Sequence, residues 1–515
     1  MVSTFHGLET AKRGMFTQQT ALSVVGHNIA NANTPGYSRQ RVNFEQTEPY
    51  PSPALNRPQI PGQIGTGVEA GSIQRIRDSF LDVQYRNEHN KLGYWETKAN
   101  ALKQMEEVMN EPSDSGLAKT MDMFWQSLQD LAVNPKNPGA RSVVRERGIA
   151  LAETFGYLSN SLSDIRQDLG NEIDVTEKEV NSLLEQIDGV NDQIAAVEPH
   201  GYLPNDLYDE RDRLIDNLSQ LVNIKVSYQP TGGNAESGAE GKAIIDLMGQ
   251  NNALSTNLVN TQGFQKIKVN YPPSDEQSYV TGITVGEMDI PIESFKSDGK
   301  LKGLIESFGM QNQSGEVSGD YPEMLKELDN LSYTFAVEFN KVHSAGMSPN
   351  EISNSTDEAI PFFQDSEFGA NMEREGFAKR MEISDKIRES LDNIANAGGT
   401  DPTMGDATTL QALADLVNQE FDYANGEDSE KASFRSYYEV LIGGMAVDTQ
   451  NAVRLTENSG TLRQEVEKRR MSTSAVSLDE EMTNMIKFQH AYNASARMIT
   501  LQDELLDRII NGMGA

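Results

Sequence analysis

The hydrophobic positions near the start of the chain repeat at alternating steps of three and four residues. The repeat consists of Leu8, Ala11, Met15, Gln18, Leu22, Val25 and Ile29, of which only Gln18 is polar. Such steps place side chains in a narrow seam along a helix that packs against another helix. The helix is predicted to end within residues 28–37, because asparagine forms local side-chain hydrogen bonds and Pro35-Gly36 is a turn pair.

The end of the chain shows a second apolar seam. Ser477-Leu478-Asp479-Glu480 fits a capping box, in which Ser477 caps a helix and Glu480 reaches back to the Ser477 backbone. We interpret this helix as the partner of the first one. The candidate assembly residues are Leu8, Met15, Leu22, Val25 and Ile29 on the first helix and Leu478, Met482, Met485, Tyr492, Ala496, Ile499 and Leu506 on the last.

Between these ends the pattern changes between long helical repeats and one β-rich stretch. Helical spacing predicts helices over residues 78–109, 117–131, 140–197, 205–221, 325–342 and 434–466. Short β-branched runs within residues 222–295 predict a small inserted β domain. Residues 45–71 alternate proline with glycine, which predicts extended, turn-rich backbone.

These elements predict a mainly α fold with an inserted β-rich domain and a coiled-coil-like hairpin formed by both chain ends. A chain of 515 residues is too long for one core, so several domains are expected. We predict an inner helical domain of residues 1–60 with 477–515, and an outer β-rich domain of residues 225–298. The remainder, 61–224 with 299–476, forms a mostly helical middle domain with an irregular polar stretch at about 346–430.

Composition narrows the classes of partner. The chain has 77 acidic and 44 basic residues, a formal net charge of −33. This balance argues against binding to nucleic acid or to anionic membranes, which attract basic patches. The absence of cysteine excludes disulfides and a thiolate nucleophile. No secretory signal is visible at the amino terminus, so we expect a cytoplasmic protein or one that leaves by another route.

The chain shows little that supports catalysis. The six histidines lie far apart, without a second histidine or a carboxylate at metal-ligand spacing. Residues 65–71 are spaced one residue too widely for a GxGxxG phosphate loop. The charged runs Lys468-Arg469-Arg470 and Glu480-Glu481 are predicted to lie on solvated helix faces. We therefore expect no cofactor, no metal and no enzymatic activity.

The predicted stop of the first helix resembles the shared amino-terminal signature of bacterial flagellar axial proteins, the family of rod, hook and hook-associated proteins. The signature residues are Asn28, Ala30, Asn31, Thr34, Gly36 and Tyr37. Further positions are similar to hook-associated members, namely Arg75, Arg77, Asp78, Asn205, Asp206, Asp209, Arg211, Asp212 and the pattern at 476–482. The β-rich insert has no counterpart in this resemblance.

The resemblance implies a structural component of the hook–filament junction of the bacterial flagellum, needed for its assembly and for motility. It implies secretion through the flagellar type III export apparatus without a cleaved signal. The implied partners are further copies of the chain in a ring or helical layer, the hook protein and a second junction protein (hook-associated protein 3). It also implies a dedicated export chaperone that binds the last helix.

A second class of protein, a cytoplasmic coiled-coil scaffold, would also explain the heptads and the missing signal. It would not explain the asparagine-rich stop or the matching seams at the two ends. Burial of one apolar side chain contributes about 1.5–3 kcal/mol, whereas ordering each backbone residue costs about 1–2 kcal/mol. Because only about two residues in seven face a seam, we expect the terminal helices to be marginally stable until neighbouring subunits cover them.

Overall fold

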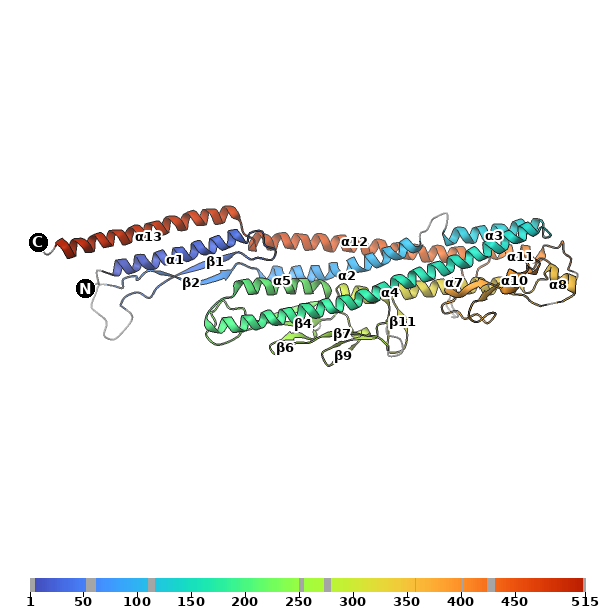
Figure 1. Ribbon diagram of the computed structural model, residues 1–515, viewed down its shortest axis with the longest axis horizontal. Coiled ribbons are helices and arrows are strands. Elements are labelled where there is room, and N and C mark those ends of the chain that lie inside the picture. The colour runs from blue at the N-terminus through green and yellow to red at the C-terminus, as the bar shows by residue number, and fades with distance from the viewer. Residues whose placement is uncertain are drawn as a thin grey trace. The chain divides into compact units, whose positions relative to one another are not determined.

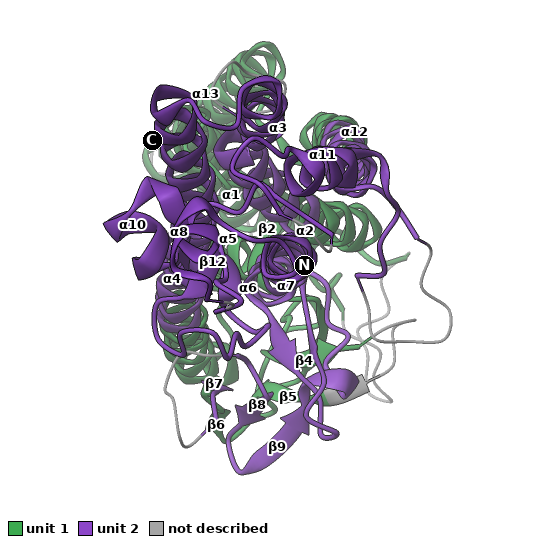
Figure 2. Cartoon of the chain, turned by 90° about the vertical axis from the view of Figure 1, so that its right-hand side faces the viewer, with its two compact units in different colours: residues 1–92, 179–267, 458–515 green, residues 93–178, 268–457 purple. Residues whose placement is uncertain are grey.

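The computed structural model describes residues 5–51, 62–109, 116–249, 254–272, 279–356, 358–399, 402–423 and 431–512. Part of the predicted proline-rich stretch, 52–61, lies outside these residues. The contacts form two compact units, shown in Figure 2. Unit 1 comprises Met1–Leu92, Glu179–Ile267 and Asn458–Ala515, and unit 2 comprises Gly93–Lys178 and Lys268–Glu457.

Unit 1 contains the first and last helices of the chain. Helix α1 (His6–Ala30) lies antiparallel beside α13 (Leu478–Gly512), as Figure 1 shows. Strands β1 (Gln40–Gln46) and β2 (Val68–Arg75) pair antiparallel and pack on α1. The prediction of turn-rich backbone for residues 45–71 missed this strand pair, because proline and glycine mask the alternation at its two ends.

A small apolar cluster holds the strand pair on the terminal helices. Ala21, Val24 and Val42 are buried, and Ala70, Ile73 and Phe488 pack against them. The ring of Phe488 on α13 also meets the ring of Phe44 on β1, with centroids 5.8 Å apart. The cluster therefore includes residues from α1, both strands and α13.

The rest of unit 1 is built around α5 (Asn205–Leu221) and a four-stranded sheet. The sheet has the order β3-β4-β5-β6, with the bounds Ile224–Gln229, Lys242–Met248, Leu254–Asn260 and Gly263–Phe264. Asn191, on α4 (Pro138–Val197), donates to the carbonyl of Ala243 and accepts from its amide, both at 2.9 Å. This amide pair fixes the first residues of β4 on the helix.

Unit 2 has an aromatic core. Phe124 on α3 (Leu117–Val133) is fully buried among Phe335, Phe339, Phe362 and Phe363. The other elements with residues in unit 2 include α2 (Ser79–Met109), α6 (Lys300–Phe308), α7 (Asp320–His343), α11 (Thr408–Asp415), α12 (Phe434–Ser474) and the strands β7 (Ile267–Asn270), β8 (Gly282–Val285), β9 (Met288–Pro291), β12 (Phe363–Asp365) and β13 (Met381–Ile383). Helices α2, α4 and α12 contribute residues to both units.

The structure confirms the predicted fold class, a mainly α chain with a β-containing middle region and a hairpin of both chain ends. The long helices match the predicted ranges closely, and α5 begins and ends as predicted. Strand β5 (Leu254–Asn260) was not predicted, because its asparagine, serine and threonine residues resemble a loop. The division into inner, middle and outer domains stays a prediction, since the contacts define two units.

Among the residues that the structure describes, no helix combines the length and the apolar character needed to cross a membrane.

Candidate functional site

The two terminal helices lie close together at two glycines of α1. A Cβ atom placed on Gly7 would lie 3.0 Å from Nε2 of Gln502, and one on Gly14 would lie 3.2 Å from Oγ of Ser495. The pairs are seven residues apart on both helices, in opposite directions. Such spacing is that of a heptad seam between antiparallel helices.

The same heptad positions continue to the other end of the pair. On α1 they are Gly7, Gly14, Ala21 and Asn28, which we call the small-residue seam. On α13 they are Gln502, Ser495, Phe488 and Glu481. The sequence pattern did not reveal this seam, because glycine carries no hydrophobic signal.

The predicted assembly residues of α1 and α13 differ in how far they are buried. Val25 is buried, and those that are half-buried are Leu8, Met15, Leu22, Ile29, Met485, Tyr492, Ala496, Ile499 and Leu506. Leu478 and Met482 are exposed, the latter by 58%. Further large apolar side chains of α13 that are exposed are Ile486, Met498, Leu501, Leu505, Ile509 and Ile510.

The signature residues form a tight turn and a buried polar centre. The amide of Tyr37 donates to the carbonyl of Thr34 at 3.2 Å, which closes a turn with Pro35 and Gly36 in its middle. Gly36 has φ = 83°, a conformation that side chains rarely adopt, so this turn requires glycine at that position. Ala30 and Thr34 are exposed and Asn31 is half-buried, whereas Asn28 is only 1% exposed.

Asn28 uses its full hydrogen-bonding capacity. Its Oδ1 accepts from the hydroxyl of Tyr37 at 2.8 Å and from the amide of Gln40 at 3.0 Å. Its Nδ2 donates to the carbonyl of Gln40 at 2.9 Å and to Oε2 of Glu481 at 3.1 Å. Burial, assisted by nearby Asp206, raises the pKa of Tyr37, which keeps its hydroxyl a donor. The signature asparagine therefore joins α1, the turn, β1 and α13.

Arg39 completes this centre. Its Nε donates to Oε1 of Glu481 at 2.8 Å, and its Nη1 donates to Oε2 of Glu480. Its backbone amide also donates to the carbonyl of Ser474 at 2.8 Å, at the end of α12. We call Asn28, Arg39 and Glu481 the terminal contact.

The terminal contact corrects two predictions for the start of α13. Glu481 was expected on a solvated face but is 1% exposed, because its carboxylate is held by Arg39 and Asn28. Glu480 was expected to reach back to Ser477 in a capping box, and the structure gives it Arg39 as its partner. Residues near in sequence could not indicate a partner that lies more than four hundred positions away.

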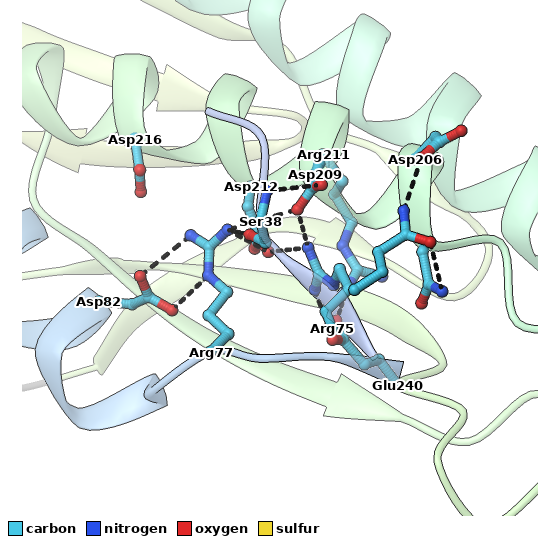
Figure 3. Close-up of polar contacts among 12 residues, drawn as sticks. Ser38, Arg75, Arg77, Asp82, Asp206, Asp209, Arg211, Asp212, Asp216 and Glu240 are labelled. Carbon is cyan, nitrogen blue, oxygen red and sulfur yellow. Dashed lines mark hydrogen bonds and ion pairs between the residues drawn. The ribbon is translucent and has the colours of Figure 1, made fainter. Parts of the chain in front are cut away.

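A network of buried ion pairs lies beside the signature turn and runs along one face of α5 (Figure 3). Asp209 accepts from Nη1 of Arg75 at 2.7 Å and from the amide of Ser38 at 3.0 Å. Asp212, one turn later, accepts from Arg75 at 3.0 Å and lies 3.2 Å from Nη1 of Arg77. The resemblance identified these positions, and the structure brings them together.

The network extends through the next turn of α5 to the end of α12. Asp216 accepts from Nε of Arg86 at 2.8 Å and from Nη1 of Arg470 at 2.6 Å. Asp82 accepts hydrogen bonds from both Nε and Nη2 of Arg77. Arg470 was expected on a solvated face; the prediction is wrong for this residue, because its guanidinium bridges Asp216 and Asp82.

The charges of the network set the pKa of its central carboxyl group. Burial alone would raise the pKa of Asp212, but the guanidinium groups of Arg77, Arg75, Arg86 and Arg211 outweigh burial and hold this pKa well below its ordinary value. Asp209 behaves differently: burial raises its pKa, and Arg75 offsets this only in part. Asp212 is therefore the firmly ionised centre of the network.

The arrangement is suited to holding chain segments together. In the described part of the chain, no group of three or more histidine or acidic side chains is placed to hold a metal ion. The network's carboxylates accept from guanidinium groups or backbone amides of the same chain. The site therefore consists of two paired helices, a turn and the charges that fix them.

Comparisons with known proteins identify the class to which these paired ends belong. The family model for flagella basal body rod protein matches residues 8–37, which are α1 and the signature turn. The model for the flagellar basal body rod FlgEFG protein C-terminal region matches residues 468–512, which include α13. Both halves of the site are thus characteristic of flagellar axial proteins.

The rest of the chain specifies the family. The model for the flagellar hook-associated protein FlgK helical domain matches residues 102–358. Flagellar hook-associated protein 1 of Bacillus subtilis is 45% identical over 100% of this chain and 99% of its own length. That of Escherichia coli is 24% identical over 98% of this chain and 99% of its own. The chain therefore belongs to the flagellar hook-associated protein 1 family.

A solved structure shows a similar fold. The flagellar hook junction protein FlgK from Burkholderia pseudomallei is 13% identical, with a TM-score of 0.58 over 78% of this chain and 100% of that one. Family membership gives the chain a structural role at the hook-associated junction of the flagellum and an association with flagellar hook components. The alternative of a cytoplasmic coiled-coil scaffold is not supported.

The network predicts a large effect of Asp212→Asn on unit 1. The change leaves several buried guanidinium groups without a full counter-charge, which costs about 3–5 kcal/mol. Trp95 and Trp125, the chain's two tryptophans, both lie in unit 2, so fluorescence follows denaturant unfolding of unit 2, far-UV circular dichroism follows both units, and a dichroism transition without a fluorescence change reports unit 1. The control is Glu210→Gln, on the same helix, which removes an exposed pair with Arg213 and should cost less than about 1 kcal/mol. Equal effects of the two changes would contradict the account.

The lowered pKa of Asp212 also predicts a pH dependence. In the unfolded chain an aspartate has a pKa of about 3.9. The ion pairs of Asp212 therefore contribute fully to folding stability above that pH, and this contribution is lost as the pH falls below it. Because asparagine does not titrate, the stability difference between the unsubstituted chain and Asp212→Asn isolates this carboxyl group. The difference should be constant from pH 7 to about pH 4 and shrink towards pH 3. A difference that grows on acidification would have the wrong sign.

Proposed function

We propose that the paired helices α1 and α13 are the surface through which subunits assemble at the junction between hook and filament. The observation that carries this proposal is the exposed apolar side of α13. Met498, Leu501 and Leu505 are each exposed by 44–47% in the single chain, although α13 already pairs with α1.

Burial of these residues against a neighbouring subunit would lower the free energy. Burial of one such side chain contributes about 1.5–3 kcal/mol, so several of them together supply a substantial association energy. Exposed apolar stripes of this kind are typical of protein–protein contacts. The polar residues of the turn and the network then lead the chain away from the helical layer that the paired ends would form.

Further copies of this chain in a ring or helical layer, the hook protein and hook-associated protein 3 are the proposed neighbours. Secretion through the flagellar type III apparatus is the proposed route to the flagellum. The contacts of the site, which are apolar packing and ion pairs within the chain, support a structural protein without enzymatic activity.

Leu501→Asp tests the assembly surface. Because Leu501 is exposed in the single chain, the change should leave the fold intact while placing a charge in the subunit contact. A strain that carries it should lose nearly all swimming motility and release filament subunits into the medium. Thr500→Asp is the matched control, since it adds the same charge at the neighbouring exposed position, about 100° around the helix.

The control strain should swim as well as the parent. Normal motility with Leu501→Asp would contradict the proposal. Equal loss in both strains would show that charge on α13, and not loss of an apolar contact, is responsible.

We further propose that the same apolar side of α13 binds a flagellar export chaperone before secretion. A chain truncated after residue 476 lacks α13 and should no longer co-purify with the chaperone. A chain that begins at residue 31 lacks α1 but keeps α13, and should still bind. Chaperone binding by the chain truncated after residue 476 would refute this assignment without affecting the assembly proposal.

A further inference from the structure

We propose that the terminal contact of Asn28, Arg39 and Glu481 determines the register in which α1 and α13 pair. Its members act as positioning residues, which select one alignment of the two helices from those that the remaining seam permits. The inference rests on the proposed function only for its consequence, since the register decides which side chains α13 presents to a neighbouring subunit.

The small-residue seam alone does not distinguish alignments that differ by seven residues. Gly7, Gly14 and Ala21 are all small and follow at steps of seven, so a shift of α13 by one heptad replaces one small partner by the next. A shift of one heptad keeps the same face of α13 towards α1, so the half-buried apolar residues of that face still pack against the first helix. Packing therefore permits more than one register.

Glu481 distinguishes these alignments. In the observed register one carboxylate oxygen accepts from Arg39 and the other accepts from Asn28. A shift that moves Ser495 from Gly14 to Gly7 would bring Glu481 to Ala21, which packs in the apolar cluster with Val24 and Val42. A carboxylate without a partner is strongly disfavoured there.

The short connection between α12 and α13 limits how far α13 can shift. Residues 475–477 separate the end of α12 at Ser474 from the start of α13. One heptad of helix is about 10.5 Å long and three extended residues reach only about 10 Å, so a shift of one heptad also requires residues at an adjoining helix end to leave the helix. The amide of Arg39 bonds the carbonyl of Ser474, so Arg39 ties the terminal contact to the start of this connection.

Disulfide trapping in the full-length chain measures the register directly. The chain has no cysteine, so two introduced cysteines can pair only with each other within one chain. A Cβ on Gly14 lies 4.0 Å from Cβ of Ser495, close to the roughly 3.8 Å of a disulfide, so Gly14→Cys with Ser495→Cys reports the observed register. Gly7→Cys with Ser495→Cys and Gly14→Cys with Gln502→Cys report a shift of one heptad in either direction. Each pair is oxidised with diamide in dilute monomer, and the linked peptides are quantified by mass spectrometry.

With Glu481 present, the observed-register disulfide should exceed either shifted one by at least about a hundredfold, the preference expected for a buried, paired carboxylate. Glu481→Ala should reduce this ratio to about tenfold or less, with a rise in a shifted product. Glu480→Ala is the matched control, since this neighbour pairs with the same arginine but is exposed. It should leave the ratio unchanged.

Two results would overturn the inference. If Glu481→Ala leaves the observed register dominant by a hundredfold, packing alone sets the alignment. If it lowers the observed product without raising a shifted one, the terminal contact contributes stability but not register. Because the measurement uses monomer, it is independent of whether Leu501→Asp abolishes motility.

Discussion

The chain's two ends meet at one buried carboxylate. Glu481, on the last helix, is removed from water and has both oxygens bonded, one to Arg39 and the other to Asn28 of the first helix. A buried charge is tolerated only with such partners, so the two helices cannot separate at this end without leaving it unpaired. The side-chain amide of Asn28 also bonds Tyr37 in the signature turn and Gln40 at the start of β1.

The ion network on α5 supports this contact from the neighbouring segments. Ser38, in the turn segment, bonds Asp209, while β2 supplies Arg75 and the end of α12 supplies Arg470. Segments distant in sequence thus meet on a single face of one helix. Buried ion pairs add little net stability but penalise wrong arrangements, so we infer that these pairs specify how the chain leaves the paired terminal helices.

Hydrophobic periodicity was sufficient to predict the long helices, including α1, α5 and α13, because each combines a sustained apolar repeat with clear end signals. It was insufficient for the contact between them. Gly7 and Gly14 allow a close approach of the helices but add nothing to an apolar pattern. Charged residues such as Glu481 and Arg470 were assigned to solvent because their partners lie far away in sequence. The resemblance identified Asn28, and only the structure showed what it binds.

The central claim is that the terminal contact anchors the paired helices in the single chain. Amide hydrogen exchange of the monomer, resolved along α1 and α13, tests it most directly. The account predicts the strongest protection around Asn28, Gln40 and Glu481, with protection falling steadily towards His6 and the carboxyl end of α13. Uniformly fast exchange along both helices, with no protection of the Gln40 amide, would contradict it.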